Sequence, residues 1–353
     1  MSKKVKVSLL LISTFIVFCF GLKFYLDKTY LNQFEREAIV GEDRYETMVK
    51  ISETRWKKSR EAVLINSSSM LDAISASPFA YKNDIPMFFI EQNNLNTTIK
   101  DELKRLKVEK VYLIGGELSI DKKVEDDINK LNIESERIAG ETGFETTLLL
   151  ASKVMDGVDN KKLALVNAEA GIPNGVSFVP IAQKNNIPII LIKDNNEKEF
   201  LQFAKENNIE EIYILGNTDQ ISKKIEKSFK ESIRINGKDR FDTNKKIIQE
   251  FYDYKNLKQV YITKGGIHTQ ADFLNTLSIS PIAANNNVPI VLSEDSMNKE
   301  LLTFLEDCNI EKISEIGFEF ERPKIINENS IRYIVNIVII ILAIFALKRV
   351  IYL

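Results

Sequence analysis

Three stretches of the chain share one pattern and decide its fold: AIVGEDRYETMVKIS at residues 38–52, RIAGETGFETTLLLAS at residues 137–152 and RINGKDRFDTNKKII at residues 234–248. Each holds a glycine that is followed, three residues later, by Arg44, Gly143 or Arg240, and then by an aromatic residue, an acid and a threonine. The three glycines stand near 100 residues apart. A pattern that recurs at a fixed spacing indicates tandem structural repeats.

Two further markers recur in the same phase. The first reads SPFAYKNDIPMFFI at residues 77–90, VPIAQKNNIPIILI at residues 179–192 and SPIAANNNVPIVLS at residues 280–293. The second reads VYLIGG at residues 111–116, IYILGN at residues 212–217 and ISEIGF at residues 313–318. Three markers in one order, three times, predict three copies of one unit, at residues 38–136, 137–233 and 234–328.

Helices and strands are predicted to alternate within each unit. In the first unit we expect a helix at residues 46–58, a strand at 62–65, and a helix that runs to the Lys-Asn pair at 82–83. A strand then opens after a proline, and an amphipathic helix at residues 98–106 precedes the strand that ends in glycine. Strands of continuous Ile, Leu and Val between helices predict an α/β fold with a parallel sheet covered on both faces.

Both chain ends are predicted to be membrane segments. Lys3, Lys4 and Lys6 lie in a short tail at residues 1–6, and an apolar run follows, so residues 7–26 are predicted to be a transmembrane helix or an uncleaved signal anchor. Residues 27–37 would be a linker. A second transmembrane helix is predicted at residues 329–353, where YIVNIVIIILAIFAL precedes a basic end. The basic flanks predict that both termini are cytoplasmic and that the repeats lie outside the membrane.

The composition excludes several classes of function. No acid occurs before Asp27 or after Glu328, and those ends hold seven of the 48 basic residues. The remaining 41 basic residues face 50 acidic ones, a balance of −9 that argues against nucleic acid as a partner. Two cysteines, Cys19 and Cys308, exclude a disulfide framework, and the single His268 excludes a histidine cluster for metal. No cofactor is predicted.

The three markers together resemble the clostridial cell-wall-binding repeat of type 2. The resemblance rests on the Gly-x-x-Arg-aromatic-Glu-Thr pattern, on DAISASP at residues 72–78 and on the Ile-Gly-Gly at residues 114–116, and it covers about 280 of the 353 residues. It implies three tandem Rossmann-like units in a pseudo-threefold arrangement. It also implies that such a module holds surface proteins noncovalently on an anionic polymer of the Gram-positive cell wall.

The candidate ligand-binding residues are Arg44, Arg137, Arg234, Arg240 and Asp72. A guanidinium binds phosphate or carboxylate through paired, charge-assisted hydrogen bonds. These arginines could instead pair with carboxylates of the Asp72 type between units. For Asp72 and its counterparts Asn174 and Asn275, the position near a helix start favours helix capping over ligand binding, and Asp72 stays a candidate. The units differ, because Gly143 takes the place of Arg44 and Arg240.

Three functions are therefore weighed from the sequence. The first is a noncatalytic cell-wall binding protein in the cell membrane, whose repeats grip an anionic wall polymer and tether it to the lipid through two spans. The second is a platform for assembling other envelope proteins, with contacts through Asn336 in the second span. The third, an enzyme acting on wall glycan, is disfavoured because no pair of carboxylates recurs with catalytic spacing.

Overall fold

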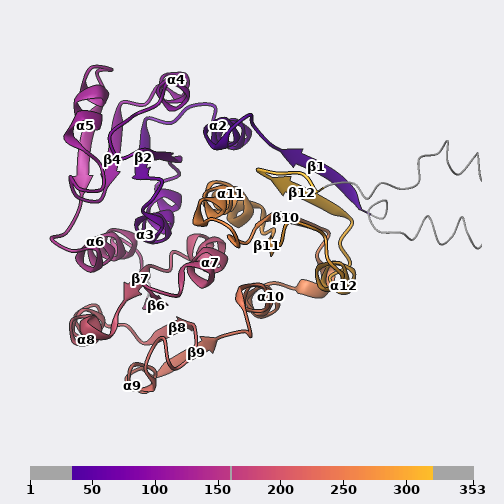
Figure 1. Ribbon diagram of the computed structural model, residues 1–353. Helices are drawn as coiled ribbons and strands as arrows, with labels where there is room; N and C mark the ends of the chain where they lie inside the picture. The colour runs from indigo at the N-terminus through magenta and orange to yellow at the C-terminus, as the bar shows by residue number, and fades with distance from the viewer. Residues whose placement is uncertain (1–33, 160, 321–353) are drawn as a thin grey trace, which may run out of the picture. The chain divides into compact units, whose positions relative to one another are not determined.

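Three parallel sheets of four strands organise the chain in the computed structural model, which describes residues 34–159 and 161–320 (Figure 1). The first sheet has the order β3-β2-β4-β5, with β2 at Glu61–Asn66, β3 at Met87–Ile90, β4 at Lys110–Ile114 and β5 at Glu134–Ile138. The second has the order β7-β6-β8-β9, with β6 at Lys162–Asn167, β7 at Ile189–Ile192, β8 at Glu211–Leu215 and β9 at Glu231–Ile235. The third has the order β1-β12-β10-β11, with β1 at Glu35–Ile39, β10 at Gln259–Lys264, β11 at Ile290–Ser293 and β12 at Lys312–Ile316.

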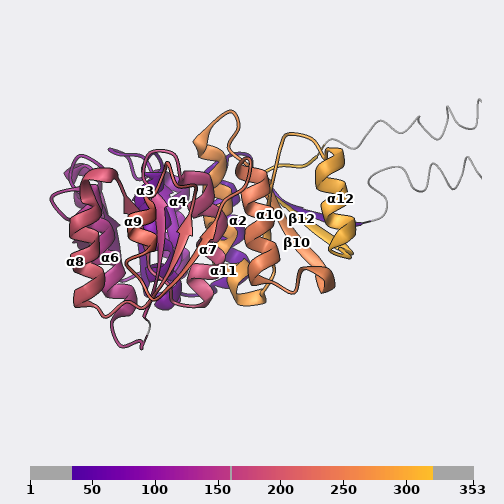
Figure 2. The same ribbon diagram turned by 90° about the horizontal axis from the view of Figure 1, so that it is seen from below.

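Helices connect the strands in every unit and cover the sheets, as the alternating pattern predicts (Figure 2). The first unit contains α2 at Arg44–Arg55, α3 at Met70–Lys82, α4 at Thr97–Leu106 and α5 at Lys122–Asn129. The second contains α6 at Gly143–Met155, α7 at Ile172–Lys184, α8 at Glu197–Glu206 and α9 at Lys223–Glu226. The third contains α10 at Arg240–Phe251, α11 at Phe273–Asn286 and α12 at Lys299–Asp307. Short 3-10 turns lie at Asp194–Asn196, Tyr254–Asn256 and Gln270–Asp272.

The fourth strand of each sheet is not among the predicted elements. Strands β5, β9 and β1 consist mostly of charged and polar residues, as in ESERI, ESIRI and EREAI, rather than of a continuous apolar run. They lie at sheet edges, where one side of the strand meets water. Each of these strands comes just before a turn motif in sequence but pairs with a strand of another unit. Strand β5 joins the sheet of the first unit, β9 that of the second and β1 that of the third, so the sheets are offset by one strand from the sequence repeats.

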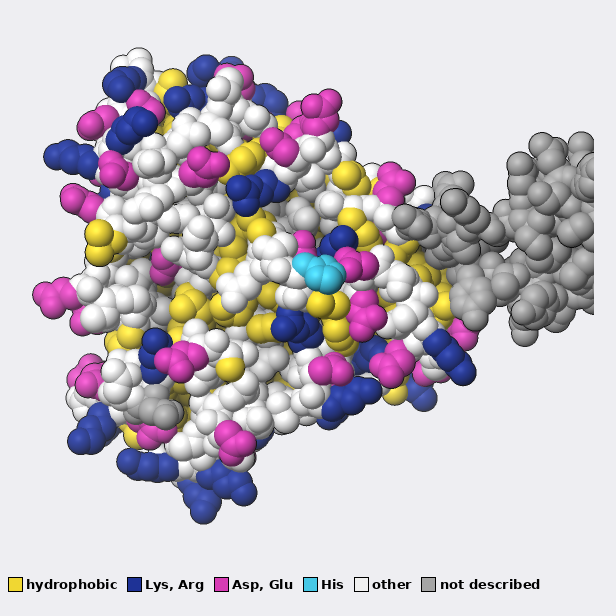
Figure 3. All heavy atoms as spheres, viewed as in Figure 1, with side chains coloured by type: hydrophobic (Ala, Val, Ile, Leu, Met, Phe, Trp, Pro, Cys, Tyr) yellow, Lys and Arg dark blue, Asp and Glu magenta, His cyan; other side chains and the backbone are white. Residues whose placement is uncertain are grey.

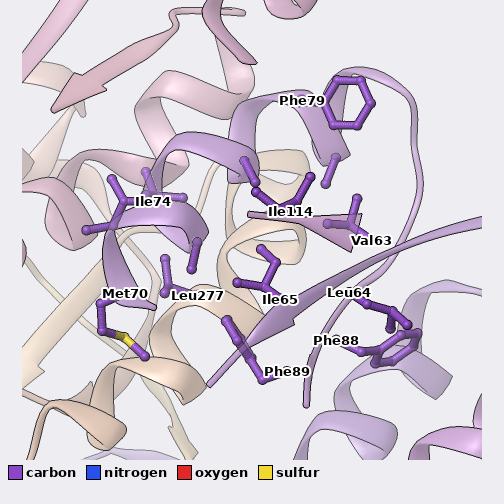
Figure 4. Packing of buried hydrophobic residues seen from close by; sticks show 14 of the residues in the cluster. Val63, Leu64, Ile65, Met70, Ile74, Phe79, Phe88, Phe89, Ile114 and Leu277 are labelled. Carbon is purple, nitrogen blue, oxygen red and sulfur yellow. The ribbon is translucent and has the colours of Figure 1, made fainter. Parts of the chain in front are cut away.

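The three helices α3, α7 and α11 pack against one another in the middle of the molecule (Figure 1). The packing is close, because a Cβ added at Gly175 of α7 would lie 3.2 Å from the side chain of Ile74 in α3. Figure 4 shows Met70 and Ile74 of α3 near Leu277 of α11 in one buried cluster. Gln183 of α7 joins all three helices, since its Nε2 donates to the Ser77 carbonyl at 3.4 Å and to Ser280 Oγ at 2.9 Å.

The helices that follow the turn motifs connect the units in a ring. Helix α6 of the second unit packs on α3 of the first, α10 of the third packs on α7 of the second, and α2 of the first packs on α11 of the third. The ring is closed by β1, which pairs in parallel with β12 from Glu35 opposite Lys312 to Ile39 opposite Ile316. These contacts confirm three units of one α/β type around a common centre.

The predicted membrane segments at residues 7–26 and 329–353 lie outside the described residues. Within residues 34–159 and 161–320, none of the helices combines the length and the apolar character that crossing a bilayer requires. The two transmembrane helices therefore remain predictions from the sequence.

Candidate functional site

The repeated turn motif is a helix cap, and its glycine, acid and threonine all serve that cap. In the first unit the Gly41 N–H donates to Thr47 Oγ1 at 2.9 Å, and the Glu42 N–H donates to the Glu46 carboxylate at 2.6 Å. The same pairs of bonds recur from Gly140 and Glu141, and from Gly237 and Lys238. A Cβ on Gly41 would lie 2.4 Å from the Thr47 nitrogen, so only glycine fits. These bonds hold the turn before the helix, and the N-cap residue Asp43 accepts from the free N–H groups of Tyr45 and Glu46 at the helix start.

The position of Arg44, Gly143 and Arg240 is not used by this cap. Each is the first residue of its helix, α2, α6 or α10, and lies near the carboxyl ends of the strands. Arg44 is exposed, and its guanidinium carbon lies 5.1 Å from the centre of the Tyr45 ring. Arg240 is half-buried and donates to the carbonyls of Gly265 and Gly266, at 2.8 and 2.6 Å, just after β10. Open parallel sheets bind ligands at this end of the strands.

Arg137 and Arg234 lie elsewhere, at the ends of the edge strands β5 and β9. Arg137 donates to the Gly115 carbonyl at 2.8 Å and to Glu125 of α5 at 3.1 Å. Arg234 donates in the same way to the Gly216 carbonyl at 2.9 Å and to Glu226 of α9 at 2.8 Å. Both guanidinium groups therefore fasten the loop after a strand to the following helix. The ligand-binding role predicted for them remains a prediction.

Asp72, Asn174 and Asn275 are not helix caps, which corrects the sequence interpretation. Each is the third residue of its helix, and the caps of α3 and α7 are Ser69 and Gly171. Asn174 is buried and its Nδ2 lies 3.3 Å from the Leu215 carbonyl at the end of β8. In the first unit Asp72 occupies this place beside Gly115, and burial raises the pKa of its carboxyl to about 6 although a bond from Ser69 acts against the shift.

One large cleft opens where the first and second units meet. It has a volume of about 620 Å³, within the usual size of small-molecule sites. The loop before α3, the start of α6, the end of β7 and Gln270 of the third unit line it. Its apolar wall consists of Met70, Leu71, Phe144, Ala168, Ile172 and Leu191. Its polar groups belong to Ser68, Ser69, Asp72, Thr142, Lys193, Asn195, Asn196 and Gln270.

Gly143 leaves this cleft open. A Cβ added at Gly143 would meet no atom within 4 Å, so the space in front of α6 is free for a side chain. A smaller hollow of about 370 Å³ lies between the start of α10 and the start of α12 in the third unit, and its lining includes the charged residues Lys238, Lys245 and Glu300. Gly143, which replaces the arginine of the other two units, therefore leaves room in the cleft where a side chain would otherwise stand.

Charged side chains surround the rest of this face, while hydrophobic side chains are visible near its middle (Figure 3). His268, exposed in the loop before α11, lies 2.6 Å from Asp295, which also pairs with Lys264 at 3.0 Å. These two partners hold the pKa of the Asp295 carboxyl below its usual value. Among the described residues, no group of three or more His, Cys, Asp or Glu side chains could hold a metal ion.

Several residues of the cleft could not be singled out from the sequence. Lys193, Asn195 and Asn196 follow β7 in an ordinary polar loop, and Gln270 belongs to a different unit. Phe144 carries the one available signal, because it is the aromatic residue of the turn motif in the second unit. The sequence identifies Asp72 and the special status of Gly143, but not that the two line one cavity.

Comparisons with known proteins agree with this architecture. The profile of Cell wall binding domain 2 (CWB2) matches three stretches, residues 38–125, 137–226 and 234–331. N-acetylmuramoyl-L-alanine amidase LytC of Bacillus subtilis is 26% identical over 230 residues, which are 65% of this chain and 45% of the amidase. The amidase enhancer of the same organism is 23% identical over 217 residues, 61% of this chain and 29% of the relative. The chain thus spans less than half the length of these relatives.

Two solved structures from Clostridium difficile share the fold. Cwp6 superposes with a TM-score of 0.74 at 26% identity, covering 83% of this chain and 47% of Cwp6. Cwp8 superposes with a TM-score of 0.71 at 26% identity, covering 87% of this chain and 51% of Cwp8. The matched stretches contain the three turn motifs, the three central helices and the strand ends that carry the candidate site. The chain therefore belongs to the Cell wall binding domain 2 (CWB2) family.

Proposed function

We propose that this protein binds an anionic polymer of the Gram-positive cell wall without catalysing a reaction. The observation that carries the proposal is the placement of Arg44 and Arg240 at the first residues of α2 and α10, at the carboxyl ends of the strands. The cap of each helix does not need these arginines. The partly positive start of a helix and a guanidinium group both favour an anionic group of a ligand.

Local arginines resolve the conflict between an acidic chain and an anionic ligand. Charges farther apart than about 8 Å are largely screened at physiological salt, so the balance of −9 acts weakly at contact distance. A phosphate or carboxylate held directly by a guanidinium is screened much less. Binding of this kind depends on a few positions and weakens as salt is added.

The membrane part of the proposal rests on the chain ends. Residues 7–26 and 329–353 would cross the cytoplasmic membrane, with lipid as their partner and with both basic ends in the cytoplasm. The compact unit at residues 34–319 would then lie on the wall side and tether the polymer to the membrane. The similarity to an amidase and an amidase enhancer is expected to reflect a shared binding part, because the chain matches less than half of each.

The test is a pull-down of a fragment covering residues 28–330 on purified Gram-positive cell walls. Residues 34–319 form a compact unit, and β1 closes it against β12, so this fragment is expected to fold. We expect retention on intact walls, loss of retention on walls stripped of their anionic polymers, and weaker retention at high salt. Retention on neither wall would overturn the proposal and favour the envelope assembly platform.

Replacing both Arg44 and Arg240 by alanine is expected to weaken retention about tenfold or more, since each charge-assisted contact contributes about 1.5–3 kcal/mol. The matched control replaces Arg60 and Lys161 by alanine. These exposed basic residues precede β2 and β6, at the opposite end of the sheets. If both double variants lose retention to the same extent, the total positive charge of the protein holds the polymer, and not the arginines at the carboxyl ends of the strands.

A further inference from the structure

The cleft at Gly143 differs in chemistry from the positions that carry arginine. Of the described residues that line it, the charged ones are Asp72 and Lys193, one acid and one base. Lys193 is exposed and lies 3.3 Å from Glu169, which offsets its charge. The remaining polar groups are hydroxyls and carboxamides, which can both donate and accept hydrogen bonds. An anionic group would find little charge to hold it here.

The wall of the cleft offers an apolar surface beside these hydrogen-bonding groups. Phe144 is partly exposed at the start of α6, and Leu191 and Ile172 continue the apolar side. A saccharide ring has one face of C–H groups and a rim of hydroxyls, so it matches an aromatic surface flanked by hydroxyls and carboxamides. At about 620 Å³ the cleft is too large for a single small ion and can hold more than one ring.

We infer that the cleft between the first and second units is a binding site for a neutral saccharide segment. The inference rests on the proposed function and takes the wall polymer to be one in which sugar rings separate the charged groups. The arginines at α2 and α10 would hold the charges, and the cleft at Gly143 would hold the neutral part between them. Of the three equivalent positions, those of Arg44 and Arg240 would then contact charged groups, and that of Gly143 would contact neutral sugar.

The test uses the full-length chain in mild detergent and neutral oligosaccharides released from the wall polymer by hydrofluoric acid, which cleaves its phosphodiester bonds. Binding is measured by isothermal titration calorimetry. We expect saturable binding to the wild-type chain and at least tenfold weaker binding to Gly143→Gln, whose uncharged side chain would occupy space in the cleft beside Phe144. Because Cβ at Gly143 meets no atom within 4 Å, this variant is expected to fold.

Two further variants test whether binding of the neutral oligosaccharides depends on the cleft. Leu149→Arg alters an exposed residue on the same helix, 44% accessible and outside the cleft, and is expected to bind the neutral oligosaccharides like the wild type. Gln270→Ala, on the opposite side of the cleft, is expected to weaken them several-fold while leaving the fold intact.

Failure of the inference and failure of the proposed function give different results. If the neutral oligosaccharides do not bind, or if Gly143→Gln binds them like the wild type, the cleft is not a saccharide site. Retention of the intact polymer through Arg44 and Arg240 would then still support the proposed function. If the neutral oligosaccharides bind but the intact polymer is held equally after both arginines are replaced, the cleft remains and the proposed anionic grip is wrong.

Discussion

Replacing Arg36 by alanine is expected to lower the free energy of unfolding by about 3–5 kcal/mol. Arg36 belongs to β1, and its Nε donates to Oε1 of Glu315 in β12 at 2.6 Å. The Glu315 side chain is 2% exposed and that of Arg36 is 15% exposed, so the carboxylate is buried and the guanidinium covers it at the edge of the sheet. Removing the guanidinium leaves a buried carboxylate without its arginine, which costs far more than the pair itself contributes.

The effect reaches beyond one contact because β1 closes the ring of units. The helix that follows it, α2, packs on α11 of the third unit, and Arg55 of α2 donates to the Pro281 carbonyl in α11 at 3.1 Å. Loosening β1 therefore exposes the junction between the first and third units. We expect one cooperative unfolding transition in the wild type, and a transition at a lower urea concentration in the variant.

Urea denaturation of the fragment covering residues 28–330, followed by the fluorescence of the buried Trp56, measures this change. Lys312→Ala is the matched control on the same pair of strands. Lys312 pairs with Glu37 at 2.7 Å, but these side chains are 29% and 46% exposed, so the expected loss is about 1 kcal/mol or less. Equal losses for both variants would contradict a special role of the buried pair.

The sequence predicts the repeats and most of the secondary structure because equivalent residues have the same structural role in each of the three units. The glycine, acid and threonine of the turn motif form one cap in each unit, and the apolar runs form the inner strands. The predicted strand at residues 62–65 extends by one residue at each end, and the predicted helix at residues 98–106 begins one residue earlier. These elements are set by local hydrogen bonds and by burial.

The edge strands and the cleft depend on contacts that are distant in sequence. Strand β1 gains its partner 277 residues later, and its alternating charges resemble those of a loop. The cleft needs the start of α6, the loop before α3 and Gln270 to meet, which follows only from how α3, α7 and α11 pack. Arg137 and Arg234 are basic residues near the same glycines in sequence, yet their edge strands direct each of them to a carbonyl at a strand end and to an acid of the helix that follows that strand.

Asp72 is expected to have the second large effect on the free energy of unfolding. The sign of this effect follows from the upward shift of the Asp72 pKa. Burial raises the folded-state pKa from 3.8 to about 6. Well below pH 4 the carboxyl is protonated in both states and makes no difference to the free energy of unfolding. As pH rises from about 4 to 6, the unfolded chain ionises freely and the folded protein resists, so the free energy of unfolding falls by up to about 1.4 kcal/mol per pH unit.

Asp72→Asn is therefore expected to raise the free energy of unfolding by about 2 kcal/mol at pH 7 and to change it little at pH 4. The second and third units already carry Asn174 and Asn275 at this place, and Asn174 lies within 3.3 Å of a strand-end carbonyl. The carboxamide of the variant can donate to the corresponding carbonyl of Ile114. A neutral group that donates suits this crevice better than a carboxylate, which only accepts.

Urea denaturation at pH 4, 5, 6 and 7 tests this expectation, with the exposed Asp219→Asn as the control for loss of one negative charge. The stabilities of the wild type and the control should change with pH in parallel, and their difference from Asp72→Asn should grow between pH 4 and 6. A variant that is destabilised equally at every pH would show that the carboxylate itself is needed in the fold. The expected gain in stability would instead mean that the one carboxylate among two carboxamides is kept for a reason other than stability, and binding at the cleft that Asp72 lines supplies such a reason.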